Sequence, residues 1–159
     1  MKTNVKKGFG FGLTSGVITT LGMIVGLHAG TGSKMVVLGG IFIIAVADAL
    51  SDALGTHISE EAEDQHTSKE VWEATFATFG TKLIVALTFV IPVLLFSLTT
   101  AIWVSIAWGL SLIIIFSYLI SREEGLKSSF YVVLEHLLIA VFVVITTHYI
   151  GDWVHQVFK

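Results

Sequence analysis

The stretch from Met35 to Leu54 is almost entirely apolar and is long enough to cross a lipid bilayer as one helix. It nevertheless carries two carboxylates, Asp48 and Asp52. In lipid such a run has to be helical, because every backbone polar group must find its partner within the segment. An ionisable side chain at the bilayer centre costs roughly 2.5–3.5 kcal/mol on insertion scales, so it usually faces a pathway or a partner. The two aspartates therefore limit both the fold and the function.

The spacing of the two acids indicates what they do. Residues four apart lie on the same face of a helix, so Asp48 and Asp52 point in one direction. Two oxygen donors on one face predict a route for a cation or a proton. The alternative is a pair of buried acids held by serine, threonine or backbone partners, which serves only helix packing. We favour the transport interpretation because neutral residues fill a packing role at lower cost.

Composition places the whole chain in the membrane. Apolar residues make up 54% of it and the mean hydropathy is +0.86, which predicts an all-α, polytopic membrane protein. Windows of about 20 residues predict five transmembrane helices, near 8–28, 35–57, 76–97, 100–120 and 130–150. The links are short, so we expect one domain over residues 1–159, with a short acidic cytoplasmic segment at about 58–74. The lipid bilayer is thus the first expected partner.

Several classes of function find no support in the sequence. There is no cysteine, which excludes disulfides and thiolate ligands. No basic patch with interleaved aromatic residues is present, so no nucleic-acid partner is expected. The sequence also lacks a Ser/His/Asp arrangement, a phosphate loop, an HExxH helix and a nucleotide fingerprint. We therefore do not expect an enzyme, although an acid pair used for hydrolysis is a further alternative.

Basic residues predict the orientation. They flank the expected spans mainly on one side, and positive charge concentrates in cytoplasmic loops. The N terminus is accordingly expected in the cytoplasm and the C terminus outside. For so compact a chain, a prokaryotic plasma membrane is the expected location. The residues on the cytoplasmic side are Lys2, Lys6, Lys7, Lys69, Lys82, Arg122 and Lys127, against Lys34 and Lys159 on the other.

Small residues recur every fourth position in the first two spans, a spacing that lets membrane helices approach closely. This pattern predicts a homodimer through the glycine-rich first helix and the second helix. Packing within one chain is the alternative. The residues concerned are Gly8, Gly12, Gly16, Gly22 and Gly26 in the first span and Ala45, Ala49 and Ala53 in the second. Pro92 predicts a kink in the third span.

Other polar residues lie near the predicted cytoplasmic side. Glu60, Glu63, Asp64 and His66 follow the second span and form a candidate oxygen-rich mouth for divalent cations, because hard cations prefer carboxylates and imidazole suits iron, manganese or zinc. The alternative is an ordinary solvated helix face. Lys82 is expected to extend to the lipid headgroups or, less favoured, to pair with Glu135 at the membrane edge.

Two segments resemble a known family. The run from Gly10 to Thr20 is similar to the first helix of the vacuolar iron transporter family, and the run from Ala45 to Gly55 is similar to its second helix. The five spans also fit, in a short form that lacks the cytoplasmic metal-binding domain. The resemblance implies a homodimer whose paired first and second helices line a route for ferrous iron or manganese, driven against a proton gradient.

The sequence departs from the family pattern at two ligand positions. Thr14-Ser15-Gly16 stands where the family usually has Asn-Asp-Gly, and Asp52 stands where it usually has methionine. We interpret the two changes together as a carboxylate that has moved from the first helix to the second. Replacing a thioether by an oxygen donor favours harder cations such as manganese, ferrous iron or calcium.

The sequence thus predicts a carrier that exports a divalent transition metal, coupled to protons, with no permanently bound cofactor. Asp48 and Asp52 are the expected ligands or proton acceptors, supported by the hydroxyls of Thr14, Ser15 and Ser51. The acids Glu60, Glu63 and Asp64 are expected to concentrate the ion. The rival interpretation is a non-transporting membrane scaffold or partner subunit, in which fixed partners such as Ser51 or a lysine satisfy both aspartates. A channel is a further possibility.

Overall fold

The computed structural model describes residues 3–63, 66–123 and 129–158, and within these ranges the chain is helical, without strands. The helices are α1 (Thr3–Thr31), α2 (Lys34–Ala62), α3 (Ser68–Thr88), α4 (Val90–Leu95), α5 (Leu98–Glu123) and α6 (Ser129–Val157). Counting α3 and α4 as one span, five helices in the described part are long and apolar enough to cross a membrane. The predicted all-α, five-helix membrane fold is confirmed, and the chain is an integral membrane protein.

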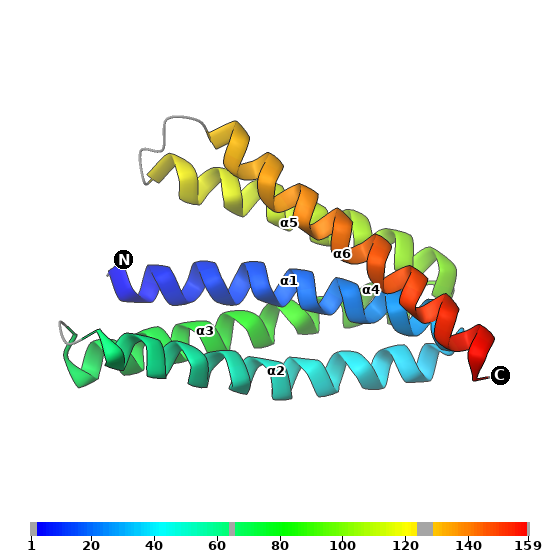
Figure 1. The fold of residues 1–159 in the computed structure, drawn as a ribbon, viewed down its shortest axis with the longest axis horizontal. Helices are drawn as coiled ribbons and strands as arrows, with labels where there is room; N and C mark the ends of the chain where they lie inside the picture. The colour runs from blue at the N-terminus through cyan, green and yellow to red at the C-terminus, as the bar shows by residue number, and fades with distance from the viewer. Residues whose placement is uncertain (1–2, 64–65, 124–128, 159) are drawn as a thin grey trace.

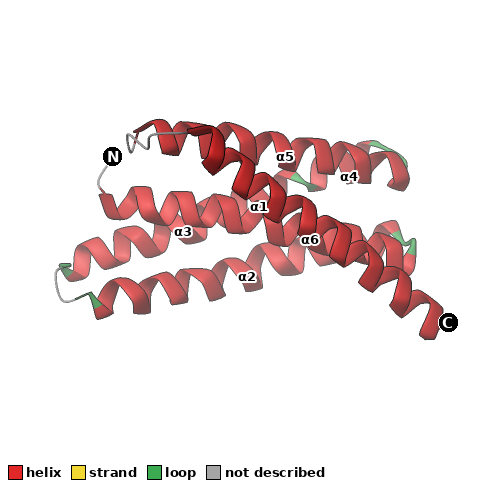
Figure 2. Ribbon diagram, turned by 45° about the horizontal axis from the view of Figure 1, so that its top comes forward, coloured by secondary structure: helices red, strands yellow, loops and turns green. Residues whose placement is uncertain are grey.

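The helices form two groups (Figure 1). One group contains α1, α2 and α3, which run side by side. The other contains α5 and α6, and α6 crosses over α1 at an angle in both views (Figure 1, Figure 2). The first residues of α1, the end of α2 and the start of α3 lie at one end of the molecule, and the C terminus lies at the opposite end. This is the arrangement that five successive spans produce.

The first helix is the centre of the packing. Its side chains Val17, Leu21 and Ile24 are fully or almost fully buried, and they contact partners from the other spans in one apolar core. In contrast, α6 contributes little buried surface beyond Ala140 and Gly151. The core therefore sits around α1, while much of α6 presents apolar side chains outward, as a lipid-facing helix does.

Local sequence sets where the helices start and stop. Gly32 has a φ of +59°, a left-handed conformation that costs glycine little, and it ends α1. Ser33 then caps α2 by accepting a bond from the Val36 N–H. At the other end, Thr67 and Glu70 form a capping box that starts α3.

The third span is interrupted close to Pro92, where the sequence predicts a kink. The helix breaks between α3, which ends at Thr88, and α4, which begins at Val90. Proline has no N–H and its ring clashes with the carbonyl four residues earlier, here that of Thr88. At the end of α3, the Thr88 hydroxyl accepts a hydrogen bond from the Trp108 Nε1–H of α5 at 3.0 Å.

The small-residue faces pack within the chain rather than standing free. A Cβ on Gly12 would lie 2.6 Å from the Thr78 carbonyl oxygen of α3, and one on Gly22 would lie 2.9 Å from Val143 of α6. Ala45 and Ala49 on α2 are completely buried. The alternative of packing within one chain therefore holds for these residues. The homodimer stays a prediction, and it requires other residues of α1 and α2.

The acidic segment predicted at about 58–74 is not a separate unit. Most of its described residues belong to the last turns of α2, which continues to Ala62, and to the start of α3 at Ser68. The second helix thus extends past Leu54, as the sequence indicated.

Candidate cation site

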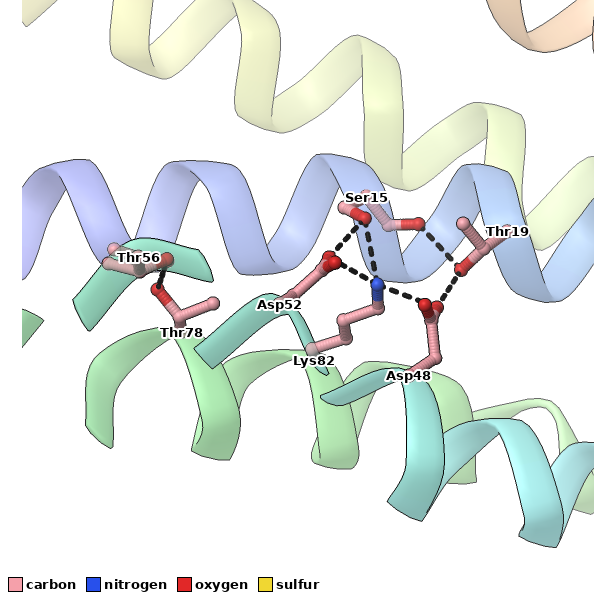
Figure 3. A network of polar contacts seen from close by, with 8 residues as sticks. Ser15, Thr19, Asp48, Asp52, Thr56, Thr78 and Lys82 are labelled. Atoms are coloured by element: carbon pink, nitrogen blue, oxygen red, sulfur yellow. Dashed lines mark hydrogen bonds and ion pairs between the residues drawn. The ribbon is translucent and has the colours of Figure 1, made fainter. Parts of the chain in front are cut away.

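A charged cluster lies where α1, α2 and α3 meet. Asp48 and Asp52 of α2 both point at the ammonium group of Lys82 from α3, and Ser15 and Thr19 of α1 close the cluster on a third side (Figure 3). The side chain of Lys82 is almost wholly buried, while those of Asp48 and Asp52 are 27% and 21% exposed. Two carboxylates therefore share one buried cation that belongs to the chain itself.

The ammonium has a complete set of partners. Lys82 Nζ lies 2.6 Å from Asp48 Oδ2, donates to Asp52 Oδ2, and donates to Ser15 Oγ at 2.8 Å. A lysine ammonium has three donors, and here each has an oxygen.

The hydroxyls of α1 bind the same carboxylate oxygens. Ser15 Oγ donates to Asp52 Oδ2 at 2.6 Å, and Thr19 Oγ1 lies 2.8 Å from Asp48 Oδ2. Each aspartate is therefore held by the lysine and by one hydroxyl of α1.

The cluster lies at mid-length of all three spans. Asp48 is the central residue of the 29-residue α2, and Ser15 and Thr19 flank the centre of the 29-residue α1. Lys82 stands at the middle of the span from Ser68 to Leu95. Helices of this length can cross a bilayer, and an unpaired charge within such a span is costly. Mutual pairing is the physical reason why three charged residues coexist there.

Glycines on α1 bring Lys82 to this position. Gly8, Gly12 and Gly16 face α3 at successive turns, and a Cβ on Gly16 would lie only 3.2 Å from Lys82 Cγ. The missing side chains let α3 approach closely enough for the lysine stem to pass between α1 and α2. The glycine spacing of α1 thus determines where the Lys82 ammonium lies.

The two expectations for Lys82 were wrong. Its side chain does not extend to the headgroups, since the residue is 1% exposed. It does not pair with Glu135, which is exposed on α6. Both expectations considered only residues near one membrane edge, whereas the partners come from the middle of another helix.

The three supporting hydroxyls predicted from sequence have different roles. Ser15 binds Asp52 and Lys82 directly. The hydroxyl of Thr14 donates to its own helix, at the Gly10 carbonyl 3.0 Å away, and lies outside the cluster. Ser51 is exposed and lines a cavity beside Asp52.

That cavity leads toward the charged cluster. It has a volume of about 470 Å³, lies between α1 and α2, and is lined by Lys7 and Phe11 of α1 and by Ser51, Asp52, Thr56 and Glu60 of α2. It therefore joins Asp52 to the end of α2 where the predicted mouth lies. A hydroxyl pair borders it: Thr56 Oγ1 lies 3.1 Å from Thr78 Oγ1, which donates to the Gly8 carbonyl.

A second ionic cluster stands at that end. Lys7 Nζ lies 3.6 Å from both Glu60 Oε1 and Glu63 Oε2, and His66 Nδ1 lies 3.1 Å from Glu60 Oε2. The Glu60 side chain is 7% exposed and that of Glu63 is 54% exposed. Two of the three predicted mouth acids are thus close together. The third, Asp64, lies outside the described residues.

The chemistry of the central cluster suits a hard cation. Carboxylate and hydroxyl oxygens are the ligands that such cations prefer. Across the described ranges, no group of three or more His, Asp or Glu side chains is placed to hold a metal ion. Asp48 and Asp52 alone are therefore too few for a complete metal site, and a metal ion held between them would need further ligands from hydroxyls, water or a further copy of the chain.

Sequence reasoning missed Lys82 and Thr19 as members of the site. A signal for the lysine was present: it is a lone basic residue within an apolar span, and such a residue needs a partner at its own depth. Asp48 and Asp52 are the acids at that depth. Thr19 lies one turn after Ser15 on the same helix face, so a site at Ser15 also predicts a role for Thr19.

Comparison with known proteins identifies no relative: no family model, no curated protein and no solved structure matches the chain. The resemblance to vacuolar iron transporters stays a prediction, based on the motifs of α1 and α2 and on the five-span architecture. Any functional conclusion must therefore come from the site.

Proposed function

We propose that the protein carries a divalent transition metal, ferrous iron or manganese, out of the cytoplasm in exchange for protons. The observation that supports this most strongly is the convergence of Asp48 and Asp52 on one cation within the length of three apolar spans. A pair of carboxylates that holds an ammonium there has the charge and the oxygen atoms to hold a metal ion in its place.

Two further observations support a carrier. The cavity of about 470 Å³ gives Asp52 an approach from one end of the helices. The cluster also has two formal negative charges for one positive charge, so it retains attraction for another cation. A purely structural ion pair needs neither feature, and apolar residues often replace buried ion pairs without loss of stability.

The proposal includes a homodimer in a prokaryotic plasma membrane, with the N terminus in the cytoplasm. The cavity between α1 and α2 bears polar side chains such as Ser51, Thr56 and Ser59 at the surface of a bundle that lipid would otherwise cover. Polar groups in lipid are costly. A second copy packed against this edge would cover them, which favours a dimer contact at α1 and α2 outside the buried glycine and alanine faces.

The rival candidate is a membrane scaffold or partner subunit without transport activity. One observation favours it specifically: Lys82 satisfies both aspartates within the chain, as a fixed structural pair would. Under this alternative the aspartates hold three helices together and no ion moves.

Manganese flux distinguishes the two functions. The chain is reconstituted in liposomes with an imposed pH gradient, and Mn²⁺ uptake is compared for the native protein, Asp48→Asn and Asp52→Asn. Asp152→Asn is the matched control, because this α6 acid contacts only His148 at 3.5 Å among the ion pairs described. The carrier predicts saturable, gradient-dependent flux that falls at least about tenfold in either site variant, since even outer partners of metal ligands have effects of that size.

Two results would contradict the proposed transport site. Absence of Mn²⁺ and Fe²⁺ flux in the folded native protein would favour the scaffold. Flux that persists unchanged in both asparagine variants would place transport elsewhere in the chain.

A further inference from the structure

We propose that Lys82 is a built-in competitor for the transported cation: its ammonium occupies the metal position, and a metal ion binds only by displacing it. This inference rests on the proposed function and adds the element that controls the affinity of the site. It assigns a role to a charged side chain that is buried almost completely, with Lys82 1% exposed.

The competition follows from which atoms the ammonium uses. Its three donors are directed at Asp48 Oδ2, Asp52 Oδ2 and Ser15 Oγ. These are the oxygens that a hard divalent cation would need, at metal–oxygen distances of about 2.0–2.6 Å. An ammonium and a metal ion cannot both occupy the space between the two carboxylates, so binding of one excludes the other.

An incoming ion and the lysine reach the carboxylates from different sides. The Lys82 ammonium stands at the end of a four-carbon stem with rotatable bonds, and displacement in this proposal is a rotation of that buried stem. The cavity between α1 and α2 reaches Asp52 but is not lined by Lys82. An incoming ion therefore meets a carboxylate first and the ammonium second.

The charged groups around Lys82 are consistent with this role. In the described part of the chain, α2 presents Asp48 and Asp52 to it, and α1 presents only the hydroxyls of Ser15 and Thr19. Among the described residues, Lys82 is the cation paired with these carboxylates, and no second one replaces it when the ammonium leaves. An arriving metal ion would supply that compensation, so departure of the ammonium and arrival of the metal are linked.

A purely structural lysine makes a different prediction. If Lys82 only holds the helices together, its removal loosens the site, and metal affinity falls or stays the same. If it competes, its removal leaves two carboxylates without a counterion, and metal affinity rises. The sign of the change separates the two roles.

The test is equilibrium binding of Mn²⁺ to the full chain in detergent micelles, followed by the electron paramagnetic resonance signal of free Mn²⁺. Lys82→Met keeps most of the stem and removes the charge. Minor conformers are commonly populated at about 0.1–10%. If the ammonium is displaced for that fraction of time, Lys82→Met binds Mn²⁺ roughly 10- to 1,000-fold more tightly than the native chain.

A second variant guards against a loss of folding. Lys82→Arg keeps the positive charge, and a guanidinium binds carboxylates in a fixed bidentate geometry. Competition predicts that this variant binds Mn²⁺ more weakly than the native chain, whereas a structural role predicts equal binding. As a further check, added n-propylammonium should compete with Mn²⁺ and weaken its binding to Lys82→Ala. It should not weaken Mn²⁺ binding to the native chain.

The outcomes separate this inference from the proposed function. In one outcome, the native chain transports and binds Mn²⁺ while folded Lys82→Met shows no gain of Mn²⁺ affinity. That result would overturn the competitor role and leave the proposed carrier function intact. Equal affinity in Lys82→Arg would also overturn it. Absence of Mn²⁺ binding and flux in the native chain would overturn both.

Discussion

The two halves of α1 both pack against a neighbouring helix through glycines, but the consequences differ. In the first half, Gly8, Gly12 and Gly16 receive α3; in the second half, Gly22, Gly26 and Gly30 receive α6. On the α6 side the close contacts are made by Val143, Thr147 and Gly151, which carry no charge. On the α3 side the last contact is Lys82, whose ammonium continues between two carboxylates.

The comparison separates helix packing from site construction. Both contacts let helix backbones approach closely, a common use of small residues in membranes. Only the contact with α3 also positions a charged side chain, and a charge at that depth is stable only beside its partners. We therefore expect disturbances of the first half of α1 to affect stability and ion binding together, and disturbances of the second half to affect stability alone.

The largest effect is expected for Gly12→Leu. A Cβ at this position would already lie 2.6 Å from the Thr78 carbonyl oxygen, so α1 and α3 must separate. We expect a loss of about 3 kcal/mol in the free energy of unfolding, together with loss of Mn²⁺ binding. Denaturant titration in detergent measures the first and Mn²⁺ titration the second. Gly80→Leu is the control, since no atom lies within 4 Å of its added Cβ; comparable damage in both variants would contradict the account.

A smaller effect, confined to stability, is expected for Gly151→Leu. Its Cβ would meet the Gly26 carbonyl oxygen at least as closely as a Cβ on Gly12 meets that of Thr78, and it would lie 2.8 Å from Ala29 Cβ. The effect is nevertheless expected to be smaller, because α6 is largely exposed and can shift. We expect a loss of about 2 kcal/mol in the free energy of unfolding. Because the cluster lies on the other half of α1, the free energy of Mn²⁺ binding should change by less than about 0.5 kcal/mol. A large drop in Mn²⁺ affinity would remove the distinction between the two halves.

Ser15→Ala tests the cluster without moving a helix. It removes the 2.6 Å hydrogen bond to Asp52 and an acceptor of Lys82. Hydrogen bonds to charged groups contribute about 1.5 kcal/mol or somewhat more, and we expect a loss of stability of that size. Thr14→Ala is the neighbouring control, because the Thr14 hydroxyl bonds only within its own helix among the contacts described. Equal losses of stability in the two variants would show that the hydrogen bonds between Ser15 and the cluster do not stabilise the protein.

The smallest effect is expected at the outer ionic cluster. Lys7 is half exposed and lies 3.6 Å from its two glutamates. Glu63 is exposed as well, whereas Glu60 is buried, so the lysine is the solvated member of the pair with Glu60. Ion pairs with solvated groups contribute about 1 kcal/mol or less and weaken as salt is added. Lys7→Met should therefore change the free energy of unfolding by less than this, and by less still in 0.5 M salt (about a 4 Å screening length). A larger, salt-independent loss would mean that the burial of Glu60, and not the solvation of Lys7, determines the strength of the outer cluster.

Much of the fold was predictable from local patterns. Apolar length gave the five spans, Pro92 gave the break before α4, and the spacing of Asp48 and Asp52 placed them on one helix face. Each of these depends on residues close together in the chain. The extended helix ends were less predictable, because caps such as Ser33 and Thr67 lie outside the apolar windows.

The partner of the aspartates was not predictable in the same way. Lys82 is 30 residues from Asp52 along the chain and 67 residues from Ser15. Which face of α3 meets α2 depends on how closely α3 approaches α1, and the glycines of α1 set that approach. The same glycines suggested a contact between two chains, because a small-residue spacing does not show which helix occupies it.

The most direct test of the central claim is the position of bound Mn²⁺ along α2. The chain has no cysteine, so Met35→Cys, at a highly exposed residue, provides a single site for a nitroxide label. Electron–electron double resonance then measures the distance from the label to Mn²⁺. At 1.5 Å per residue, an ion between Asp48 and Asp52 lies about 20–25 Å away, whereas an ion at Glu60 and Glu63 lies about 40 Å away. The account predicts the shorter distance, lost in the Asp48→Asn and Asp52→Asn chains; the longer distance, or no bound ion, would contradict it.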